Sequence, residues 1–227
     1  MDRRFSIIVP CQDVSEHIDL CVYTLVKQKV DLNEVEILLV DNASSDDTYD
    51  KLCAWEQRYP GSVILIRMDE PASLPKLCQV AYEYASGEYI SLMGANDWLN
   101  LNMYGVFHFL TEQYHPDIIQ FACGIREKLD EDYTSEPGTD AIEMYPITEE
   151  NRDDICSALI NPINHRCIYK KELIDEGMIT EYDLPAGSGI EWMDGQIMRD
   201  VIMGGATSII TFGDEVYYQR KIKRGCE

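Results

Sequence analysis

Basic residues are scarce in this chain of 227 residues. The sequence has 19 lysines and arginines against 41 aspartates and glutamates, which gives a formal net charge of −22 at pH 7. A field of that sign repels nucleic acid and anionic membrane surfaces, so we expect both to be poor partners. A phosphate-bearing ligand would need local cations or a metal ion to bind here.

Long apolar stretches are also absent. No run approaches the roughly 20 apolar residues that a membrane-crossing helix needs. The opening segment, MDRRFSIIVP, has a short apolar part and no small-residue cleavage site, so it does not resemble a secretory signal. We therefore expect a cytoplasmic protein without a transmembrane segment.

Paired cysteines are missing too. The sequence has eight cysteines, but no two of them follow C-x-x-C spacing. Most lie among apolar residues, where a free thiol behaves as a small hydrophobic group. The spacing predicts free thiols rather than a zinc site or disulfides.

Several catalytic signatures do not occur. The sequence contains no Walker loop, no G-x-S-x-G, no H-E-x-x-H and no dinucleotide-binding fingerprint. Nucleotidyltransferases generally cradle a triphosphate with a loop rich in glycine and lysine. Residues Pro10–Ser15, which follow the first apolar run, contain neither, so this class is disfavoured.

Four short apolar runs in the N-terminal half each lead to a carboxylate or an amide. The runs and the polar residues after them are Phe5–Val9 with Gln12 and Asp13, Ile37–Val40 with Asp41 and Asn42, Val63–Ile66 with Asp69, and Tyr89–Met93 with Asn96 and Asp97. Helical patterns separate the runs, and this alternation predicts an α/β fold with a mostly parallel sheet flanked by helices. Ligands of such sheets bind beyond the carboxyl ends of the strands, where these residues fall. For each residue alone, an ordinary turn or cap role is the alternative.

Helices in the first half are predicted from apolar periodicity and from end signals. Apolar residues at helical spacing predict a helix over Ser15–Lys29. We expect Ser44 or Ser45 to cap a second helix, which ends at Pro60-Gly61, and Pro75 to lie in the first turn of a third.

The second half departs from this rhythm. Its predicted elements are a helix over Asn102–Tyr114, a strand over Asp117–Cys123, a loop or hairpin over Glu127–Gly138, helices over Thr148–Leu159 and Met193–Met203 with a short one after Tyr169, and closing strands at Ile209-Ile210 and Val216–Tyr218. We expect a small antiparallel element in this half. The length allows one sizeable core and does not demand a second domain.

Several segments, in order along nearly the whole chain, resemble one known family. They are SIIVP at Ser6–Pro10, ILLVDNASSDDT at Ile37–Thr48, ASGEYISLMGANDWL at Ala85–Leu99, NHRCIYKKELI at Asn164–Ile174 and GIEWMDGQIMRDVIMGGATSIITFGDEVYYQR at Gly189–Arg220. The chain is similar to family 2 of inverting, nucleotide-sugar-dependent glycosyltransferases, which have the GT-A fold. The resemblance implies a Rossmann-like sheet in one domain over residues 1–227, with a nucleotide-sugar-binding half at 1–99 and an acceptor-binding half at 100–227.

The resemblance assigns the nucleotide base to the ends of the first strands. In the family the acidic residue after the second strand holds the base. That residue is Asp41 here, and Pro10, Gln12 and Asp13 would line the same pocket. Asp69, after the third strand, would form the other wall, unless it is only a turn residue. A carboxylate can accept a hydrogen bond from a pyrimidine imide and discriminate sharply between bases.

The metal motif of the family is D-x-D followed by another aspartate, at the end of the fourth strand. Hard oxygen ligands there suit Mg²⁺ or Mn²⁺. The aligned residues are Gly94, Ala95, Asn96 and Asp97, so the first carboxylate is absent and the second is an amide. We expect Asn96 and Asp97 to hold Mn²⁺ or Mg²⁺ weakly, with the diphosphate's help, or not at all. Asn96 would also contact the nucleotide.

Basic residues become candidates to face the diphosphate if the metal is weak. These are Lys76, which we assign to the nucleotide site, and Arg199, Arg220 and Lys221. The alternative is that they are solvated surface residues, as most lysines and arginines are.

An inverting transferase needs a general base to take the proton of the acceptor hydroxyl. The family uses a Glu-Asp pair that opens a late helix, and the aligned residues are Met193 and Asp194. The resemblance therefore predicts Asp194 as the catalytic residue, with Glu191, Trp192 and His165 on the acceptor side. The alternatives are a helix N-terminal carboxylate for Asp194, packing for Trp192 and a structural role for His165.

The resemblance and the residue roles that it implies predict a hexosyltransferase-like enzyme of polysaccharide biosynthesis. It would move a sugar, with inversion, from a nucleotide-sugar donor, a UDP-sugar by our expectation, to a hydroxyl of a glycan, lipid-linked or protein acceptor. The altered metal motif leaves two alternatives open. One is a catalytically impaired GT-A domain that serves as a binding or assembly subunit beside other glycosyltransferase subunits. The other is a metal-independent transferase.

Overall fold

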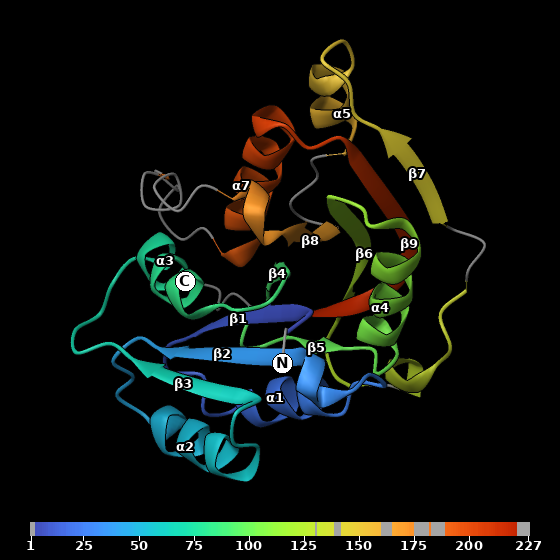
Figure 1. The fold of residues 1–227 in the computed structure, drawn as a ribbon. Coiled ribbons are helices and arrows are strands. Elements are labelled where there is room, and N and C mark those ends of the chain that lie inside the picture. Colours follow the sequence, from blue (N-terminus) through green and yellow to red (C-terminus); the bar gives the residue numbers. More distant parts are fainter. Residues whose placement is uncertain are drawn as a thin grey trace.

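The computed structural model describes residues 3–129, 131–138, 142–159, 165–174, 182 and 189–221. These residues form an α/β fold in which helices flank a curled sheet (Figure 1). Within these ranges, no helix has the length and apolar character needed to cross a bilayer.

A nine-stranded sheet runs through the described part of the chain. Its order is β3-β2-β1-β4-β8-β6-β9-β5, and β7 also pairs with β9. The strands are β1 Phe5–Cys11, β2 Val35–Asp41, β3 Val63–Arg67, β4 Tyr89–Leu92, β5 Trp98–Leu99, β6 Ile118–Arg126, β7 Ile142–Pro146, β8 His165–Lys170 and β9 Ser208–Arg220.

The first four strands pair in parallel, as their continuous apolar runs predicted. β1 lies between β2 and β4, and β3 pairs with the outer side of β2. Cys11 at the end of β1 lies opposite Asp41 of β2, and Asp41 lies opposite Arg67 of β3. The carboxyl ends of these strands therefore meet at one edge of the sheet.

The second half contributes the antiparallel pairs that the sequence predicted there. β8 is antiparallel to both β4 and β6, and β5 and β7 are antiparallel to β9. β6 and β9 pair in parallel, with register shifts over Phe121–Cys123. β9 is a single strand of 13 residues where the sequence predicted two short ones.

Helices cover both faces of the sheet (Figure 1). Ile7 and Val9 pack with α1, α2 and α4, whereas Ile8 and Leu38 pack with α3 and α7. Neighbouring residues enter different cores because successive side chains of a strand point to opposite faces. The helices are α1 Ile18–Val26, α2 Thr48–Arg58, α3 Leu74–Tyr84, α4 Met103–Tyr114, α5 Arg152–Leu159 and α7 Ile190–Gly204, with short 3-10 turns η1 Leu32–Glu34, η2 Glu131–Thr134 and η3 Lys171–Leu173.

The loop before α2 differs in detail from the prediction. The backbone N–H of Thr48 donates to Asp46 Oδ1 at 2.9 Å, so Asp46 rather than Ser44 or Ser45 satisfies the first turn of this helix. Ser45 instead donates to the carboxylate of Asp13. The loop after β2 is thereby joined to the loop after β1.

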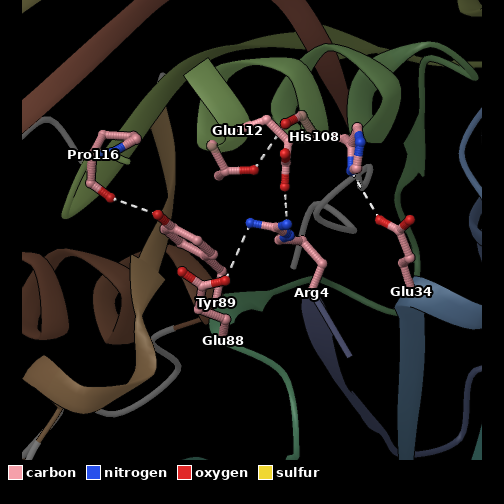
Figure 2. Close-up of polar contacts among 8 residues, drawn as sticks. Arg4, Glu34, Glu88, Tyr89, His108, Glu112 and Pro116 are labelled. Atoms are coloured by element: carbon pink, nitrogen blue, oxygen red, sulfur yellow. Dashed lines mark hydrogen bonds and ion pairs between the residues drawn. The ribbon is translucent and has the colours of Figure 1, made fainter. Parts of the chain in front are cut away.

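A polar cluster at the amino ends of β1 and β4 ties α4 to the sheet (Figure 2). Arg4 Nη1 donates to Glu88 Oε2 at 3.2 Å, and Arg4 Nη2 donates to Glu112 of α4. Tyr89 Oη donates to the carbonyl of Pro116 at 3.0 Å. These contacts hold the end of the sheet opposite the strand edge where ligands of α/β proteins bind.

Candidate functional site

A cavity of about 710 Å³ lies beyond the carboxyl ends of β1, β2 and β4. The starts of α3 and α7 and the end of β9 complete its wall, so both halves of the chain contribute to it. Of the predicted site residues, the cavity is lined by Pro10, Gln12, Asn96, Asp97 and Glu191. This is the position expected for the ligand site of an open parallel sheet.

Asn42 joins three segments of the cavity wall. It is 3% exposed, and its Nδ2 donates to Gln12 Oε1 at 2.9 Å and to the carbonyl of Ala72 at 3.0 Å. The N–H of Ala72 donates back to Asn42 Oδ1 at 2.7 Å. Asn42 was not among the predicted site residues, although its place directly after β2 was a usable signal.

Asp13 does not line the cavity, but its side chain holds the neighbouring loop after β2. It has a φ of 49°, in the left-handed region. Its Oδ1 accepts hydrogen bonds from the N–H and hydroxyl of Ser45, at 2.7 and 3.1 Å. The structure thus gives Asp13 a role in holding the loop, while its predicted contact with nucleotide stays a prediction.

Asp41 ends β2 as a fully buried carboxylate with 0% exposure. Among the described residues neither of its oxygens has a hydrogen-bond partner, and Arg67 Nε lies 3.7 Å from Oδ2. Burial and the nearby Asp41 charge raise the pKa of the Cys11 thiol. A buried carboxylate without hydrogen bonds is unfavourable, so it is a candidate to accept one from a ligand. Asp41 does not line the cavity itself, but its neighbours Cys11 and Asn42 do.

Asp69 and Lys76 lie outside the cavity lining. Both are exposed, and Lys76 Nζ donates to Gln79 Oε1 at 2.7 Å. Their assignment to the nucleotide site remains a prediction.

Asp97 lines the cavity, but its carboxylate points to β9. Its Oδ2 accepts from Tyr217 Oη at 2.5 Å, and its Oδ1 accepts from the N–H of Arg220 at 2.9 Å. Burial raises the pKa of Asp97 to about 6, against the opposing effect of the two hydrogen bonds and of Arg166. Both oxygens are thus used in anchoring the end of β9.

Gly94 stands where the family has its first metal-binding carboxylate. A Cβ at this position would lie 2.5 Å from Asp97 Oδ2 and 3.4 Å from Tyr217 Oη. The N–H of Gly94 donates to the same Tyr217 Oη at 2.9 Å. Asp97 and Tyr217 therefore occupy the space that a side chain at position 94 would need.

The donors at this end of the cavity do not fit a tightly held divalent cation. Such ions take several oxygen ligands, largely from carboxylates. The carboxyl groups of the cavity lining belong to Asp97, whose oxygens are both occupied, and to Glu191. Across the described ranges, no group of three or more His, Cys, Asp or Glu is arranged to hold a metal ion. The predicted role of Asn96 and Asp97 as metal ligands gains no support from this geometry.

Arg220 is the sole cationic side chain among the described residues that line the cavity. Its Nε donates to the carbonyl of Asn96 at 3.0 Å, and its guanidinium carbon lies 4.9 Å from the ring centre of Trp98. Arg199 is not part of the lining. Lys221 is not either, and its Nζ lies 3.4 Å from Glu127. Of the basic candidates, the structure places Arg220 alone in the cavity lining.

Asp194 does not reach the cavity, contrary to its predicted position. It is 3% exposed, its Oδ2 accepts from the N–H of Cys167 at 3.0 Å and its Oδ1 accepts from Tyr169 Oη at 2.8 Å. Burial raises the pKa of Asp194 to about 6, opposed by the charge of Arg166 and by these hydrogen bonds. The carboxylate faces β8 because it lies on the side of α7 that packs against the sheet. Asp194 thus lies outside the cavity lining in this structure, and its catalytic role stays a prediction.

The other acceptor-side predictions have different outcomes. Glu191, in the first turn of α7, lines the cavity. Trp192 is 45% exposed and does not line it. His165 begins β8, but its side chain lies outside the described part of the structure. Glu191 is thus the acceptor-side carboxylate that the structure brings to the cavity.

Arg166 and Tyr217 were missed by the sequence reasoning. Arg166 is fully buried, with its guanidinium carbon 5.2 Å from the ring centre of Tyr217. Its charge lowers the pKa of both Asp97 and Asp194 against the larger effect of burial. The only sequence signal for these residues was their place inside the segments that resemble the family.

A family model described as glycosyl transferase family 2 matches residues 6–178, most of the chain. The chain belongs to this family. Among curated family relatives, it is 27% identical over 96 residues to the poly(ribitol-phosphate) beta-glucosyltransferase of Bacillus spizizenii, a match covering 42% of this chain and 15% of that protein. It is 22% identical over 119 residues to glycosyltransferase GlyG of Streptococcus pneumoniae, covering 52% of this chain and 38% of that protein.

Solved structures confirm the predicted GT-A fold. S. aureus TarS, residues 1–349, superposes with a TM-score of 0.71 at 18% identity, over 96% of this chain and 60% of that one. A mannosyltransferase from Pyrobaculum calidifontis, solved with GDP-Man and Mn²⁺, gives a TM-score of 0.66 at 19% identity, over 99% of this chain and 59% of that one. The chain thus spans less than two thirds of the length of these relatives.

Proposed function

We propose that the chain is an inverting glycosyltransferase domain that binds a nucleotide sugar in the cavity at the strand ends. The observation that carries this proposal is the single cavity lined by strand ends of the first half and by Glu191 and Arg220 of the second. In this proposal the ends of β1 and β2 would contact the nucleotide base, Arg220 would contact the diphosphate, and Glu191 would contact the acceptor hydroxyl. Membership of glycosyl transferase family 2 supports the same activity.

The base end of the cavity favours a uridine donor. Asp41 lies behind the lining residues Cys11 and Asn42, buried without a hydrogen-bond donor in the described structure. The imide N–H of uracil would supply a donor, provided that these lining residues move to admit the base. Gln12 and Asn42 provide amide groups on the adjoining wall. S. aureus TarS, which shares the fold, has been solved with UDP and with UDP-GlcNAc. We therefore propose a UDP-sugar as donor.

Glu191 is the proposed general base. In an inverting displacement the acceptor oxygen bonds to the anomeric carbon while the bond from that carbon to the diphosphate oxygen breaks. The proton of the hydroxyl passes to the base, and the bonding pair leaves with the nucleoside diphosphate. Glu191 lines the cavity, and within the described structure its carboxylate accepts no hydrogen bond, whereas the carboxylates of Asp97 and Asp194 each accept two.

The acceptor is proposed to be a hydroxyl of a glycan, a lipid-linked sugar or a protein. The curated relative from B. spizizenii is named for a ribitol-phosphate polymer. A net charge of −22 disfavours such a polyanion here because of long-range repulsion. We therefore propose a neutral acceptor.

A second candidate function is a binding or assembly subunit that has lost catalysis. The feature that favours it is Gly94–Asn96 in place of the metal motif, with Asp97 turned to β9. Such a subunit would bind the nucleotide without turning over the sugar donor.

A panel of nucleotide sugars, assayed for transfer and hydrolysis with Mg²⁺, Mn²⁺ or chelator, tests the two functions. We expect turnover of a UDP-sugar, and loss of about a hundredfold or more in Glu191→Gln. UDP binding without turnover of any donor would favour the subunit, and absence of both would refute a nucleotide-sugar site.

A further inference from the structure

The place expected for a metal ion in this cavity is filled by protein contacts. Asp97 directs one oxygen to Tyr217 and the other to the backbone of Arg220. A side chain at position 94 would come within 2.5 Å of Asp97 Oδ2. The contacts that direct the Asp97 carboxylate to β9 also hold β9 in the cavity wall.

Arg220 is fixed at this end of the cavity by contacts of three kinds. Its backbone N–H donates to Asp97 Oδ1 at 2.9 Å, its Nε donates to the carbonyl of Asn96 at 3.0 Å, and its guanidinium lies 4.9 Å from the ring centre of Trp98. Asn96 and Asp97 are the residues that the family resemblance assigned to metal. The cationic group is therefore positioned by the altered metal motif itself.

We propose that Arg220 takes the place of a divalent cation, binding the donor diphosphate and stabilising it as it leaves, with Asp97 as the residue that positions Arg220. The inference rests on the proposed function and deepens it by assigning the leaving-group site. Asp97 then acts through the backbone of β9 rather than as a ligand.

The chemistry of this site suits a diphosphate. An arginine presents several N–H donors in a planar fork that matches phosphate oxygens, and it remains charged at any working pH. When the bond from the anomeric carbon to the diphosphate oxygen breaks, the electron pair and negative charge go to that oxygen. Arg220 would stabilise this charge without transferring a proton. In a chain with a net charge of −22, a local cation is also needed for a phosphate ligand to bind at all.

Calorimetric titration of the full chain with UDP and with uridine, in chelator and in Mn²⁺, tests the proposal. We expect UDP to bind in chelator with an affinity within about twofold of that in Mn²⁺. Arg220→Gln should weaken UDP binding about ten- to a hundredfold, since a charge-assisted contact is lost. Uridine, which has no phosphate, should bind this variant within about twofold of the wild type and so shows that it is folded.

Two further variants test whether the effect on UDP binding is specific to the guanidinium of Arg220. Arg199→Gln removes the same charge from the exposed side of α7, outside the cavity lining, and should leave UDP binding unchanged. Arg220→Lys keeps the charge without the planar fork, so its UDP affinity should fall between the wild type and Arg220→Gln.

Three outcomes overturn the proposal. A gain of tenfold or more in UDP affinity on adding Mn²⁺ would assign the diphosphate to a metal. Equal binding of UDP and uridine by the wild type would deny a diphosphate site here while leaving the nucleoside site in place. Failure of both ligands to bind under either condition would refute the proposed function together with this inference.

Discussion

Four carboxylates around the cavity fall into two pairs. Asp97 and Asp194 are almost fully buried, and protein donors occupy both oxygens of each. The carboxylates of Asp41 and Glu191 accept no hydrogen bond from the described residues, although Asp41 is just as buried and has Arg67 Nε 3.7 Å from its Oδ2. Residue type and position at the end of a strand or start of a helix are similar in the two pairs. The two pairs differ in their hydrogen-bond donors, which come from residues far away in the sequence. A carboxylate that accepts such hydrogen bonds has a structural role, and one that accepts none is available to a ligand.

The largest expected effect is on transfer, in Glu191→Gln. We expect its single-turnover rate to fall about a hundredfold or more, with UDP affinity within about twofold of the wild type. The matched control is Asp194→Asn, because the carboxylate of Asp194 already accepts hydrogen bonds from the protein. Its single-turnover rate should fall less than about tenfold. If Asp194→Asn abolishes transfer and Glu191→Gln does not, Glu191 is not the general base. Asp194 then has the catalytic role that the family resemblance implies.

The pH dependence of the unfolding free energy tests the buried carboxylate of Asp194. The pKa of Asp194 is about 6 in the folded chain against 3.8 for the ordinary group, so the folded state binds the proton more tightly than the unfolded state. Its contribution to stability is therefore greatest below about pH 4 and is lost as the pH rises to about 6. From pH 4 to pH 7, the unfolding free energy of Asp194→Asn minus that of the wild type should rise by about 2 kcal/mol.

Urea unfolding of both proteins across this range measures that difference. Taking the difference between the two proteins removes the contribution of the other carboxylates. A difference that stays constant with pH would show that the buried carboxylate is not held protonated at low pH by its surroundings.

Asp41→Asn should weaken UDP binding about ten- to a hundredfold and reduce the preference for uridine over cytidine. The amide replaces an acceptor with a mixed donor and acceptor at the base. Asp69→Asn, on an exposed loop, is the control and should change nucleotide affinity less than about twofold. Equal effects of the two variants would place Asp69 in the base site as well.

The smallest expected effect concerns packing at Gly94. Gly94→Ala should lower the free energy of unfolding by about 1 to 2 kcal/mol because its Cβ would lie 2.5 Å from Asp97 Oδ2. Gly204→Ala, at the end of α7 with no atom within 4 Å of the new Cβ, should be neutral or slightly stabilising. Urea midpoints compare the two. A neutral Gly94→Ala would mean that Asp97 can leave Tyr217 at little cost.

The parallel half of the fold was predictable because its signals are local. Continuous apolar runs such as Ile37–Val40 are typical of strands buried on both faces, and polar residues follow them at the shared edge. The second half was less predictable because its strands pair across long sequence separations. β8 lies between β4 and β6, which no local pattern indicates.

Some features of the candidate site could likewise be predicted from local sequence, and others could not. Gln12 and Asn96 could be placed in the cavity from their positions after strands. The orientation of Asp97 could not, since it depends on Tyr217, which lies 120 positions away in the sequence. Asp194 is a different case. It lies on the apolar stripe of α7 that contains Ile190, Met193, Ile197 and Val201, so helical periodicity alone could have indicated its burial.

The contact between Gly94 and Asp97 also bears on how such a site could evolve. An aspartate placed at 94 by a single substitution would collide with Asp97, and a change at Asp97 alone would release the backbone of Arg220. A carboxylate can therefore be gained at 94 only if the side chain of Asp97 turns away from Tyr217.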